Sequence, residues 1–358
     1  MTIYWFILGT PGLVAFYLAN ETRAVQLRSW FGFGFRVYFF VLMLLIGWRH
    51  EVGGDWVTYL AHIESALQQN LIEILKSPGE QAFNLVNWVS AHLGLDVYGV
   101  NLICAGIFSY GLMKFCENTQ FPWLSIVIAA PYLIIVVAMG YTRQGAAIGL
   151  VMIGLVNLAN GQKFKFVAWV IAGTLFHKSA FILIPLAILF GRKKWLTILG
   201  ILITTLLMYT LLLAEFVDIL IVNYINQEYA SSGAAIRIAM NAIPSFIFLV
   251  YRKYYYLNEQ QKIFWSWMSI GGLLFVILLL ISPSSTAVDR VALYWIPLQI
   301  FVLSGLPVAM SKKTNSKLPW VVGILLYSMV VQFTWLLYAD HRDSWLPYKF
   351  YPWQLLWN

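Results

Sequence analysis

Long apolar runs, separated by short polar stretches, dominate the sequence. A helix needs about 20 mostly apolar residues to cross a hydrocarbon core of roughly 30 Å. Ten runs approach that length, so we expect an all-α, polytopic membrane helical bundle that forms one transmembrane domain over residues 1–358. The expected spans lie near residues 3–20, 32–48, 98–115, 122–139, 143–160, 195–213, 237–252, 264–282, 291–310 and 318–338.

One further apolar segment, residues 164–190, carries His177, Lys178 and Ser179 at its middle. A charge at the centre of the bilayer is costly, so a single straight span is disfavoured. Two half-helices that meet at His177 avoid this cost if the break faces a water-filled cavity. We therefore expect a broken or re-entrant helix pair near 164–190, giving 10–12 helices in total.

The longest loop between the early spans covers residues 49–97. Its first part has apolar residues at helical spacing from Trp56 to Leu75, and a second apolar helix is expected at 81–93 after Pro78-Gly79. This pattern predicts amphipathic helices that lie at the membrane interface.

Composition and charge agree with this architecture. The chain is 61% hydrophobic and 11% charged, whereas soluble domains are about 45–50% apolar and about 25% charged. If the loops at 21–31, 116–121, 161–165, 191–194, 253–263 and 311–317 are cytoplasmic, that side carries 15 of the 23 Lys and Arg residues but only three of the 15 acids. The positive-inside rule then places both termini and the loop 49–97 outside. Because the net charge of +8 is explained in this way, we expect no nucleic-acid partner.

Four arginines fall at outer ends of spans against this charge bias: Arg49, Arg143, Arg237 and Arg290. A guanidinium is a permanently charged, forked donor that matches phosphate oxygens. Any one of them could form a structural ion pair or contact a lipid headgroup. As a set they predict a diphosphate-binding cavity on the outer side.

Two residues are candidates for proton transfer. His177 can exchange a proton near neutral pH, although a lone histidine beside an apolar helix is often only a satisfied polar group. Asp55 follows Gly53-Gly54, whose backbone freedom allows a tight turn. It could orient an arginine, accept a sugar hydroxyl or act as a base, or it could simply cap the helix that starts at Trp56.

Standard catalytic signatures are absent from the sequence. There is no phosphate-binding loop, dinucleotide fingerprint, zinc-binding histidine pair or nucleophile elbow. The outer acids do not cluster, so we expect neither a metal nor another cofactor. The two cysteines, Cys104 and Cys116, are expected to be buried thiols.

Six stretches spread over nearly the whole chain form a combined pattern. They are Arg49 to Tyr59 (R-x-x-x-G-x-D-x-x-x-Y), Glu80 to Asn87 (E-x-x-F-x-x-x-N), Arg143-Gln144, Phe176 to Ala180, Arg290 with Tyr294, and Trp345 to Tyr348. In these stretches and in their order the chain resembles the EpsG/Wzy-type family of polysaccharide polymerases. The family usually has Thr or Ser where this chain has Gly54, a departure that removes one hydroxyl.

The resemblance implies a metal-independent polymerase of exopolysaccharide, capsule or O-antigen with a GT-C-like membrane glycosyltransferase architecture. Such an enzyme sits in the bacterial inner membrane with its active site facing the periplasm or exterior. It transfers a growing glycan from undecaprenyl diphosphate to the non-reducing end of a lipid-linked repeat unit. The implied partners are the undecaprenyl-diphosphate-linked donor and acceptor, membrane lipid and a chain-length regulator protein.

Within that chemistry each candidate residue has an expected role. The donor diphosphate would contact Arg143, Arg237 and Arg290, and Arg49 would contact either lipid diphosphate. His177 is the first candidate base and Asp55 the second. The acceptor and sugars would contact Glu80, which could instead orient Arg49, together with Tyr59, Tyr294 and Lys178.

Other functions also need an outer basic cavity. A ligase would move a finished glycan from the same lipid carrier to another acceptor, and a membrane acyltransferase would also use a histidine. A flippase of lipid-linked oligosaccharide commonly shows internal repeats. No repeat is visible here, which favours an enzyme.

Overall fold

The computed structural model describes residues 1–20, 28–190, 199, 202, 233–282 and 284–357. Over these residues the fold is helical, apart from an isolated bridge between Arg49 and Phe350. The helices long and apolar enough to cross a membrane are α1 (Thr2–Asn20), α6 (Asp96–Glu117), α8 (Thr142–Ala159), α12 (Ala234–Tyr251), α13 (Glu259–Ile281), the continuous α14–η6–α15 (Ser285–Ala292, Leu293–Trp295 and Ile296–Thr314) and α16 (Leu318–Tyr338). Shorter apolar helical segments are Gly32–Gly47 within α2 (Arg28–Gly47), α7 with the π-helical η1 (Pro122–Ala129 and Ala130–Ala138), and Lys178–Ala187 within η2 (Lys178–Phe190).

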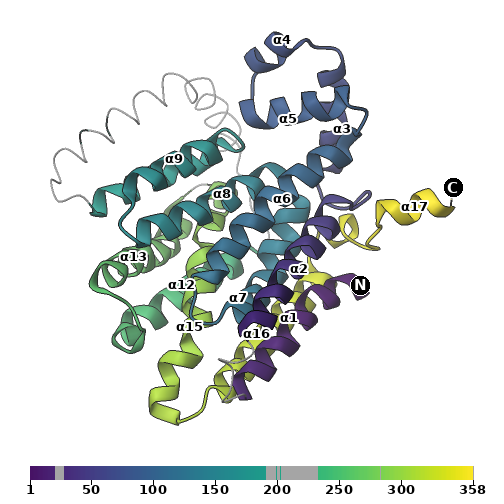
Figure 1. Cartoon of the computed structure of the whole chain (residues 1–358). Coiled ribbons are helices and arrows are strands. Elements are labelled where there is room, and N and C mark those ends of the chain that lie inside the picture. The colour runs from purple at the N-terminus through teal and green to yellow at the C-terminus, as the bar shows by residue number, and fades with distance from the viewer. Residues whose placement is uncertain (21–27, 191–198, 200–201, 203–232, 283, 358) are drawn as a thin grey trace.

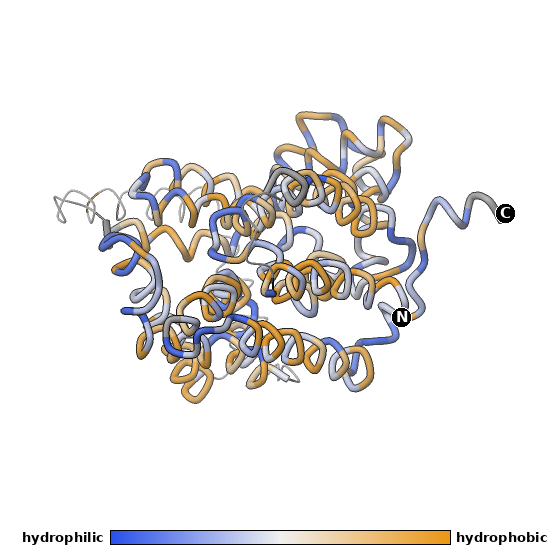
Figure 2. Tube along the Cα trace, turned by 60° about the horizontal axis from the view of Figure 1, so that its bottom comes forward, coloured by the Kyte–Doolittle hydropathy of each residue, from blue (hydrophilic) through white to orange (hydrophobic). Residues whose placement is uncertain are grey.

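The prediction of an all-α, polytopic membrane protein is confirmed. Nine of the ten expected spans coincide with these apolar helices. The tenth, near 195–213, lies outside the described residues except at positions 199 and 202. Figure 2 shows the same pattern along the chain, with hydrophobic residues on the bundle helices and hydrophilic residues gathered in the connections.

The break in the segment 164–190 lies where the sequence places it. The α-helix α9 (Lys163–Thr174) ends, three residues follow, and the chain continues from Lys178 as the 3₁₀ helix η2. Pro185 lies inside η2 and lacks the N–H that a regular helix needs. His177 is therefore set in an irregular turn between two half-helices.

The centre of the bundle is built from α6, α7–η1 and α8 (Figure 1). All nine residues of η1 are buried. The α6 and α8 backbones touch at Gly111 and Gly149. A Cβ added at Gly111 would lie only 1.9 Å from the Gly149 carbonyl oxygen, so neither helix has room for a side chain there. Such close contact between small residues is the usual way in which membrane helices pack tightly.

The helices of the loop 49–97 stand at one end of the bundle (Figure 1). They are α3 (Trp56–Leu67), α4 (Leu71–Lys76) and α5 (Gln81–His92), and they carry exposed apolar residues such as Val57 and Ile72. Both chain ends lie at this same end, because the Tyr4 hydroxyl donates to the Trp345 carbonyl (2.6 Å) and Arg49 bridges to Phe350. The loop 49–97 and both chain ends, which the charge pattern predicts to be outside, therefore lie at the same end of the bundle.

The remaining short helices are η5 (Arg252–Tyr254), η7 (Arg342–Ser344) and α17 (Tyr351–Trp357).

Candidate active site

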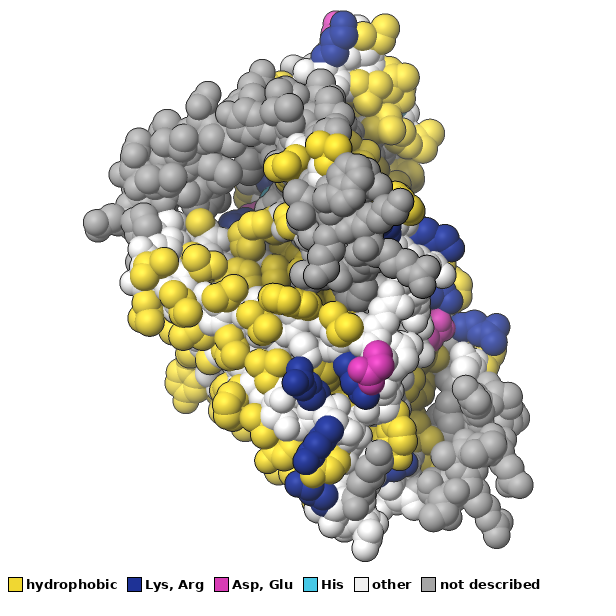
Figure 3. Space-filling view, turned by 90° about the vertical axis from the view of Figure 1, so that its left-hand side faces the viewer, with side chains coloured by type: hydrophobic (Ala, Val, Ile, Leu, Met, Phe, Trp, Pro, Cys, Tyr) yellow, Lys and Arg dark blue, Asp and Glu magenta, His cyan; other side chains and the backbone are white. Residues whose placement is uncertain are grey.

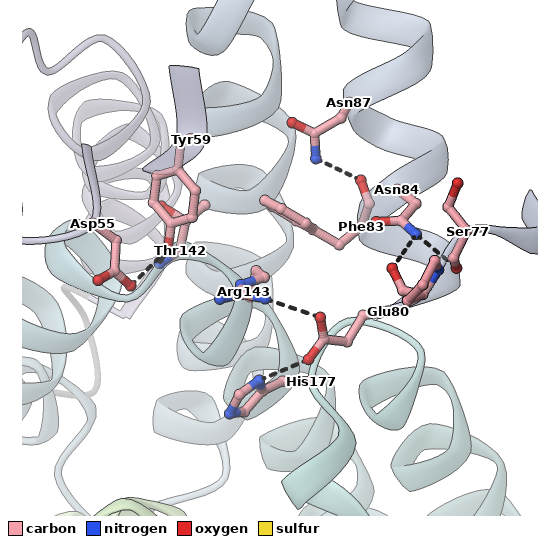
Figure 4. A network of polar contacts seen from close by, with 11 residues as sticks. Asp55, Tyr59, Ser77, Glu80, Phe83, Asn84, Asn87, Thr142, Arg143 and His177 are labelled. Atoms are coloured by element: carbon pink, nitrogen blue, oxygen red, sulfur yellow. Dashed lines mark hydrogen bonds and ion pairs between the residues drawn. The ribbon is translucent and has the colours of Figure 1, made fainter. Parts of the chain in front are cut away.

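One buried carboxylate joins two of the predicted site residues. Glu80 Oε2 lies 3.0 Å from Arg143 Nη1, and Glu80 Oε1 lies 3.3 Å from His177 Nδ1 (Figure 4). The side chain of Glu80 is only 6% exposed. The three residues come from the start of α5, the first turn of α8 and the break after α9. The fold therefore assembles this cluster, which we call the Glu80 cluster, from three distant parts of the sequence.

Neighbouring contacts explain why the E-x-x-F-x-x-x-N stretch has this spacing. The Arg143 guanidinium lies over the Phe83 ring, 5.7 Å from its centroid, a cation–π arrangement. Asn87 Nδ2 donates to the Phe83 carbonyl at 2.8 Å. The Ala82 N–H donates to the Leu175 carbonyl at 3.0 Å and so ties the start of α5 to the break. Phe83 of this motif thus contacts Arg143, and the neighbouring Ala82 holds the turn that carries His177.

The charge of Glu80 is set by competing effects. Burial raises its pKa, but the contacts with His177 and Arg143 outweigh burial and hold the pKa at about 2. Glu80 is therefore ionised at neutral pH, and it is placed to orient both the guanidinium and the imidazole.

Replacing Glu80 with glutamine should lower the free energy of unfolding by about 3 kcal/mol, because a buried charge pair loses one partner. A carboxylate with a depressed pKa contributes its full stability above its unfolded pKa of about 4.3 and loses it as the pH falls toward the folded value. The gap in thermal unfolding midpoint between wild type and Glu80→Gln should therefore be the same at pH 7.5 and pH 5.5. A gap that closes between those two values would contradict this description of Glu80.

A second group of charges lies on α12 and α14. Arg237 and Asp289 form a bidentate ion pair, with Nε to Oδ1 and Nη2 to Oδ2 both at 2.7 Å. Arg290 differs: within the described residues no carboxylate lies at ion-pair distance from its guanidinium, which is instead stacked over the Tyr141 ring at 5.3 Å. Among the described residues, the charge of Arg290 is therefore not balanced by an ion pair, at the end of the bundle that holds the Glu80 cluster.

Two hydrogen bonds tie these groups together. Gln144 Nε2 donates to the Arg290 carbonyl at 2.9 Å, and Ser179 Oγ and the Tyr294 hydroxyl lie 3.1 Å apart. Adjacent residues of α8 therefore serve both groups, with Arg143 bound to Glu80 and Gln144 bound to the backbone of Arg290. The two groups are therefore connected through neighbouring residues of α8.

Tyr141 is a site residue that the sequence interpretation missed. It lies in the turn between η1 and α8, and it is partly exposed. Burial raises its pKa while Arg290 lowers it, and Asp55, Arg237 and Asp289 also act on it. Tyr141 therefore lies between the Glu80 cluster and the second group. The only sequence feature that points to Tyr141 is its position two residues before Arg143.

Asp55 lies on the other side of Arg143 from Glu80 (Figure 4). It occupies the N-cap position of α3 without a capping hydrogen bond from its side chain. The Tyr59 hydroxyl donates to Asp55 Oδ2 at 3.3 Å and accepts the Thr142 N–H at 2.9 Å. Tyr59 thus positions Asp55 against the start of α8.

The two tyrosines expected to contact the acceptor and sugars are both buried. Tyr59 is 2% exposed and Tyr294 is fully covered. Their hydroxyls bond to Asp55 and Ser179 respectively. In this structure they support neighbouring polar groups and offer no open ring face. Lys178, the remaining acceptor candidate, is buried beside His177.

Arg49 differs from the other arginines in that its guanidinium is fully enclosed by protein oxygens. It is 1% exposed, and its donors reach the Val52 and Ile46 carbonyls, Asn101 Oδ1 and Thr142 Oγ1 at 2.6–3.0 Å. Glu80 pairs with Arg143 and His177, so the expected orientation of Arg49 by Glu80 is not what the structure shows. With its guanidinium committed to four protein oxygens, Arg49 is better suited to hold the turn before Asp55 than to bind a diphosphate.

The two glycines before Asp55 have different environments. Gly53 has φ +109°, its N–H donates to the Ser344 carbonyl, and an added Cβ would lie 2.4 Å from the Met139 carbonyl oxygen. An added Cβ at Gly54 would meet nothing closer than the Trp345 ring at 3.9 Å. Position 54 therefore has room for a small side chain such as Thr or Ser.

These environments give a matched pair of variants. Gly53→Ala should destabilise the protein by about 3 kcal/mol, because it combines a left-handed backbone with a clash against a carbonyl. Gly54→Ala should stay within about 0.5 kcal/mol of wild type. Thermal unfolding of the two purified variants tests this, and equal midpoints would show that the turn is not held as described.

The described residues contain no group of three His, Cys, Asp or Glu side chains that could hold a metal ion. Cys104 and Cys116 are free and buried, as expected.

Comparison with known proteins gives one match. The model of the EpsG family matches residues 33–350, nearly the whole chain. No curated protein and no solved structure matches. The matched region contains every residue of the Glu80 cluster and of the second group. The chain therefore belongs to the EpsG family, whose membrane proteins have a polysaccharide-polymerase type of role.

Proposed function

We propose that this protein is a glycosyltransferase that polymerises polysaccharide on the outer face of a bacterial inner membrane. The donor is the growing glycan on undecaprenyl diphosphate, and the acceptor is the non-reducing end of a lipid-linked repeat unit. One observation carries the proposal beyond family membership: Glu80 is shared by Arg143 and His177, which places a candidate base beside a candidate diphosphate ligand.

The transfer forms one bond and breaks another. The acceptor hydroxyl attacks the anomeric carbon, the bond from that carbon to the diphosphate oxygen breaks, and the hydroxyl proton passes to the His177 imidazole. Glu80 orients the ring through Nδ1. Asp55 is the second candidate for the base, from the opposite side of Arg143.

The leaving diphosphate needs positive charge that is already in place. Arg290 supplies it most directly, because no carboxylate of the described chain neutralises it. Arg143 and Arg237 are each balanced by an acid, Glu80 and Asp289 respectively, so they add directed N–H donors more than net charge. Fixed guanidinium groups stabilise developing charge without reorganisation, so a metal ion is not needed for this step. A GT-C-like architecture and a chain-length regulator as partner belong to the same proposal.

Glycans from a deletion strain separate this function from the alternatives. Loss of a polymerase should leave single repeat units attached to their normal acceptor. Long chains that accumulate unattached would instead indicate a ligase. Lipid-linked repeat units trapped on the cytoplasmic face would indicate a flippase.

A further inference from the structure

A second histidine, His62, lies beside the Glu80 cluster. Asp55 occupies the N-cap of α3, and Tyr59 and His62 follow it after four and three further residues, so the three share one side of the helix. Tyr59 turns this side toward the start of α8, because its hydroxyl accepts the Thr142 N–H at 2.9 Å. The side chain of His62 is thus directed toward the same part of the site.

Aromatic contacts hold the imidazole of His62 next to Arg143. The imidazole meets the Phe83 ring edge to face, with 5.8 Å between centroids, and it lies nearly parallel to the Tyr59 ring at 6.5 Å. The Arg143 guanidinium lies over the same Phe83 ring, 5.7 Å from its centroid. His62 and Arg143 therefore pack on one phenylalanine.

The His62 imidazole has hydrogen-bonding groups to offer a ligand. The side chain is half-exposed, and in the part of the chain that the structure describes neither ring nitrogen makes a hydrogen bond or an ion pair. Burial and the charge of Arg143 lower the pKa of His62 below its usual value of about 6.5, although Glu80 and Asp55 act in the opposite direction. The imidazole is therefore neutral at pH 7, with one N–H that donates and one nitrogen that accepts.

The surroundings of His62 favour a neutral ligand over a diphosphate. The charged side chains that act on it are Arg143, Glu80 and Asp55, which are one base and two acids. Diphosphate oxygens accept hydrogen bonds but donate none, so they would leave the accepting nitrogen of the imidazole without a partner. A sugar hydroxyl both donates and accepts, and it therefore suits either ring nitrogen.

The place of α3 in the fold also separates glycan from lipid. Hydrophobic side chains cover the side of the bundle that Figure 3 shows, with charged side chains in a hollow above them. The helix α3 stands with α4 and α5 at one end of the bundle (Figure 1). A lipid tail follows the hydrophobic side, so the part of a lipid-linked substrate that extends to α3 is its glycan. His62 lies about 10 Å along α3 from Asp55, at 1.5 Å per residue, and so holds a sugar away from that candidate base.

We propose that His62 binds a hydroxyl of a sugar in the repeat unit, in a glycan subsite between α3 and the start of α5. The inference rests on the proposed function, since it names the part of the substrate that this side of the site holds. Arg290, whose guanidinium no carboxylate of the described chain pairs with, belongs to the diphosphate. The Glu80 cluster then has the glycan on its α3 side and the diphosphate on its α14 side.

Kinetics with two restricted substrates test the subsite. A lipid-linked repeat unit that lacks its accepting hydroxyl serves only as donor, and a repeat unit on a short alkyl group serves only as acceptor. His62→Leu should raise KM about tenfold for the substrate whose sugar His62 holds, the loss expected for one hydrogen bond, with kcat changed less than about threefold. His62→Gln keeps one donor and one acceptor, so its KM should stay within about threefold of wild type.

His92 supplies the matched control. Its imidazole also lies on an aromatic ring, 4.3 Å from the centroid of Trp88, and His92→Leu should change neither KM nor kcat. If His62→Leu left KM unchanged for both substrates, the subsite would be rejected. A fall in kcat of about 100-fold would also overturn the proposal, because His62 would then act in proton transfer.

Chemical protection of the wild type tests the subsite without turnover. Diethyl pyrocarbonate modifies accessible neutral imidazoles, and peptide mass spectrometry follows each of the five histidines separately. The repeat-unit oligosaccharide, free of lipid and diphosphate, should slow the modification of His62 at least about threefold at a few times its Kd and leave the exposed His341 unchanged. Protection of His62 in a protein that does not polymerise would reject the proposed function and keep the glycan subsite. A protein that polymerises while the oligosaccharide leaves His62 unprotected would do the reverse.

Discussion

Replacing His177 with alanine should leave a folded protein whose polymerisation rate falls by about 10²–10⁴-fold, the usual contribution of a positioned acid–base group. The imidazole lies in an irregular turn between two half-helices, 15% exposed, with Nδ1 directed at Glu80. The other ring nitrogen is therefore the one that can take the acceptor proton. Initial rates with a synthetic lipid-linked repeat unit measure the effect.

A second substitution separates chemistry from packing. His177→Asn keeps a short polar side chain beside Glu80 but cannot take a proton near neutral pH, so its rate should fall as far as that of the alanine variant. Both variants should unfold within a few degrees of wild type. If His177→Asn kept more than about a tenth of the wild-type rate, proton transfer by His177 would be rejected, and Asp55 would become the leading candidate.

Replacing Arg290 with alanine should lower kcat/KM by about 10²–10³-fold, the loss expected when one preorganised charge at the leaving group is removed. Its guanidinium is stacked on Tyr141 and has no carboxylate at ion-pair distance in the described chain, so removal strands no buried acid. The midpoint of thermal unfolding should therefore change little. Arg290→Lys should recover part of the activity, because the charge remains but the forked donor geometry is lost.

Arg237 provides the contrast. Its removal leaves Asp289, which is buried, without its bidentate partner, so Arg237→Ala should lose stability as well as activity. If Arg290→Ala were destabilised as strongly as Arg237→Ala while the surviving folded enzyme kept its kcat/KM, Arg290 would be structural and the diphosphate site would lie elsewhere.

Most of the transmembrane helices could be predicted from the sequence, because a helix that crosses a membrane needs about 20 mostly apolar residues in a row. The break at His177 was predictable for the same reason, since a charged residue cannot sit in the middle of a lipid-facing span without cost. The charge bias of the loops also put Glu80, Arg143, His177 and Arg290 on one side, and the fold brings the first three into contact.

The side chains that support the site could not be predicted in the same way. Arg49 and Arg143 are both arginines at outer ends of spans, yet one is buried among protein oxygens and the other remains 29% exposed. The difference depends on which way each turn faces, and that is fixed by distant partners such as Asn101 and Ser344. The same applies to the tyrosines Tyr59, Tyr141 and Tyr294. The sequence does not indicate whether a tyrosine ring is buried or faces the site.

The proposed polymerase needs no other protein to join lipid-linked repeat units. The direct test incubates the purified protein, in nanodiscs, with its undecaprenyl-diphosphate-linked repeat unit and a metal chelator, without nucleotide sugar, and separates the products on a gel. The claim predicts a ladder of increasing chain length from wild type and none from His177→Ala. A folded wild type that leaves the native repeat unit unchanged would contradict it.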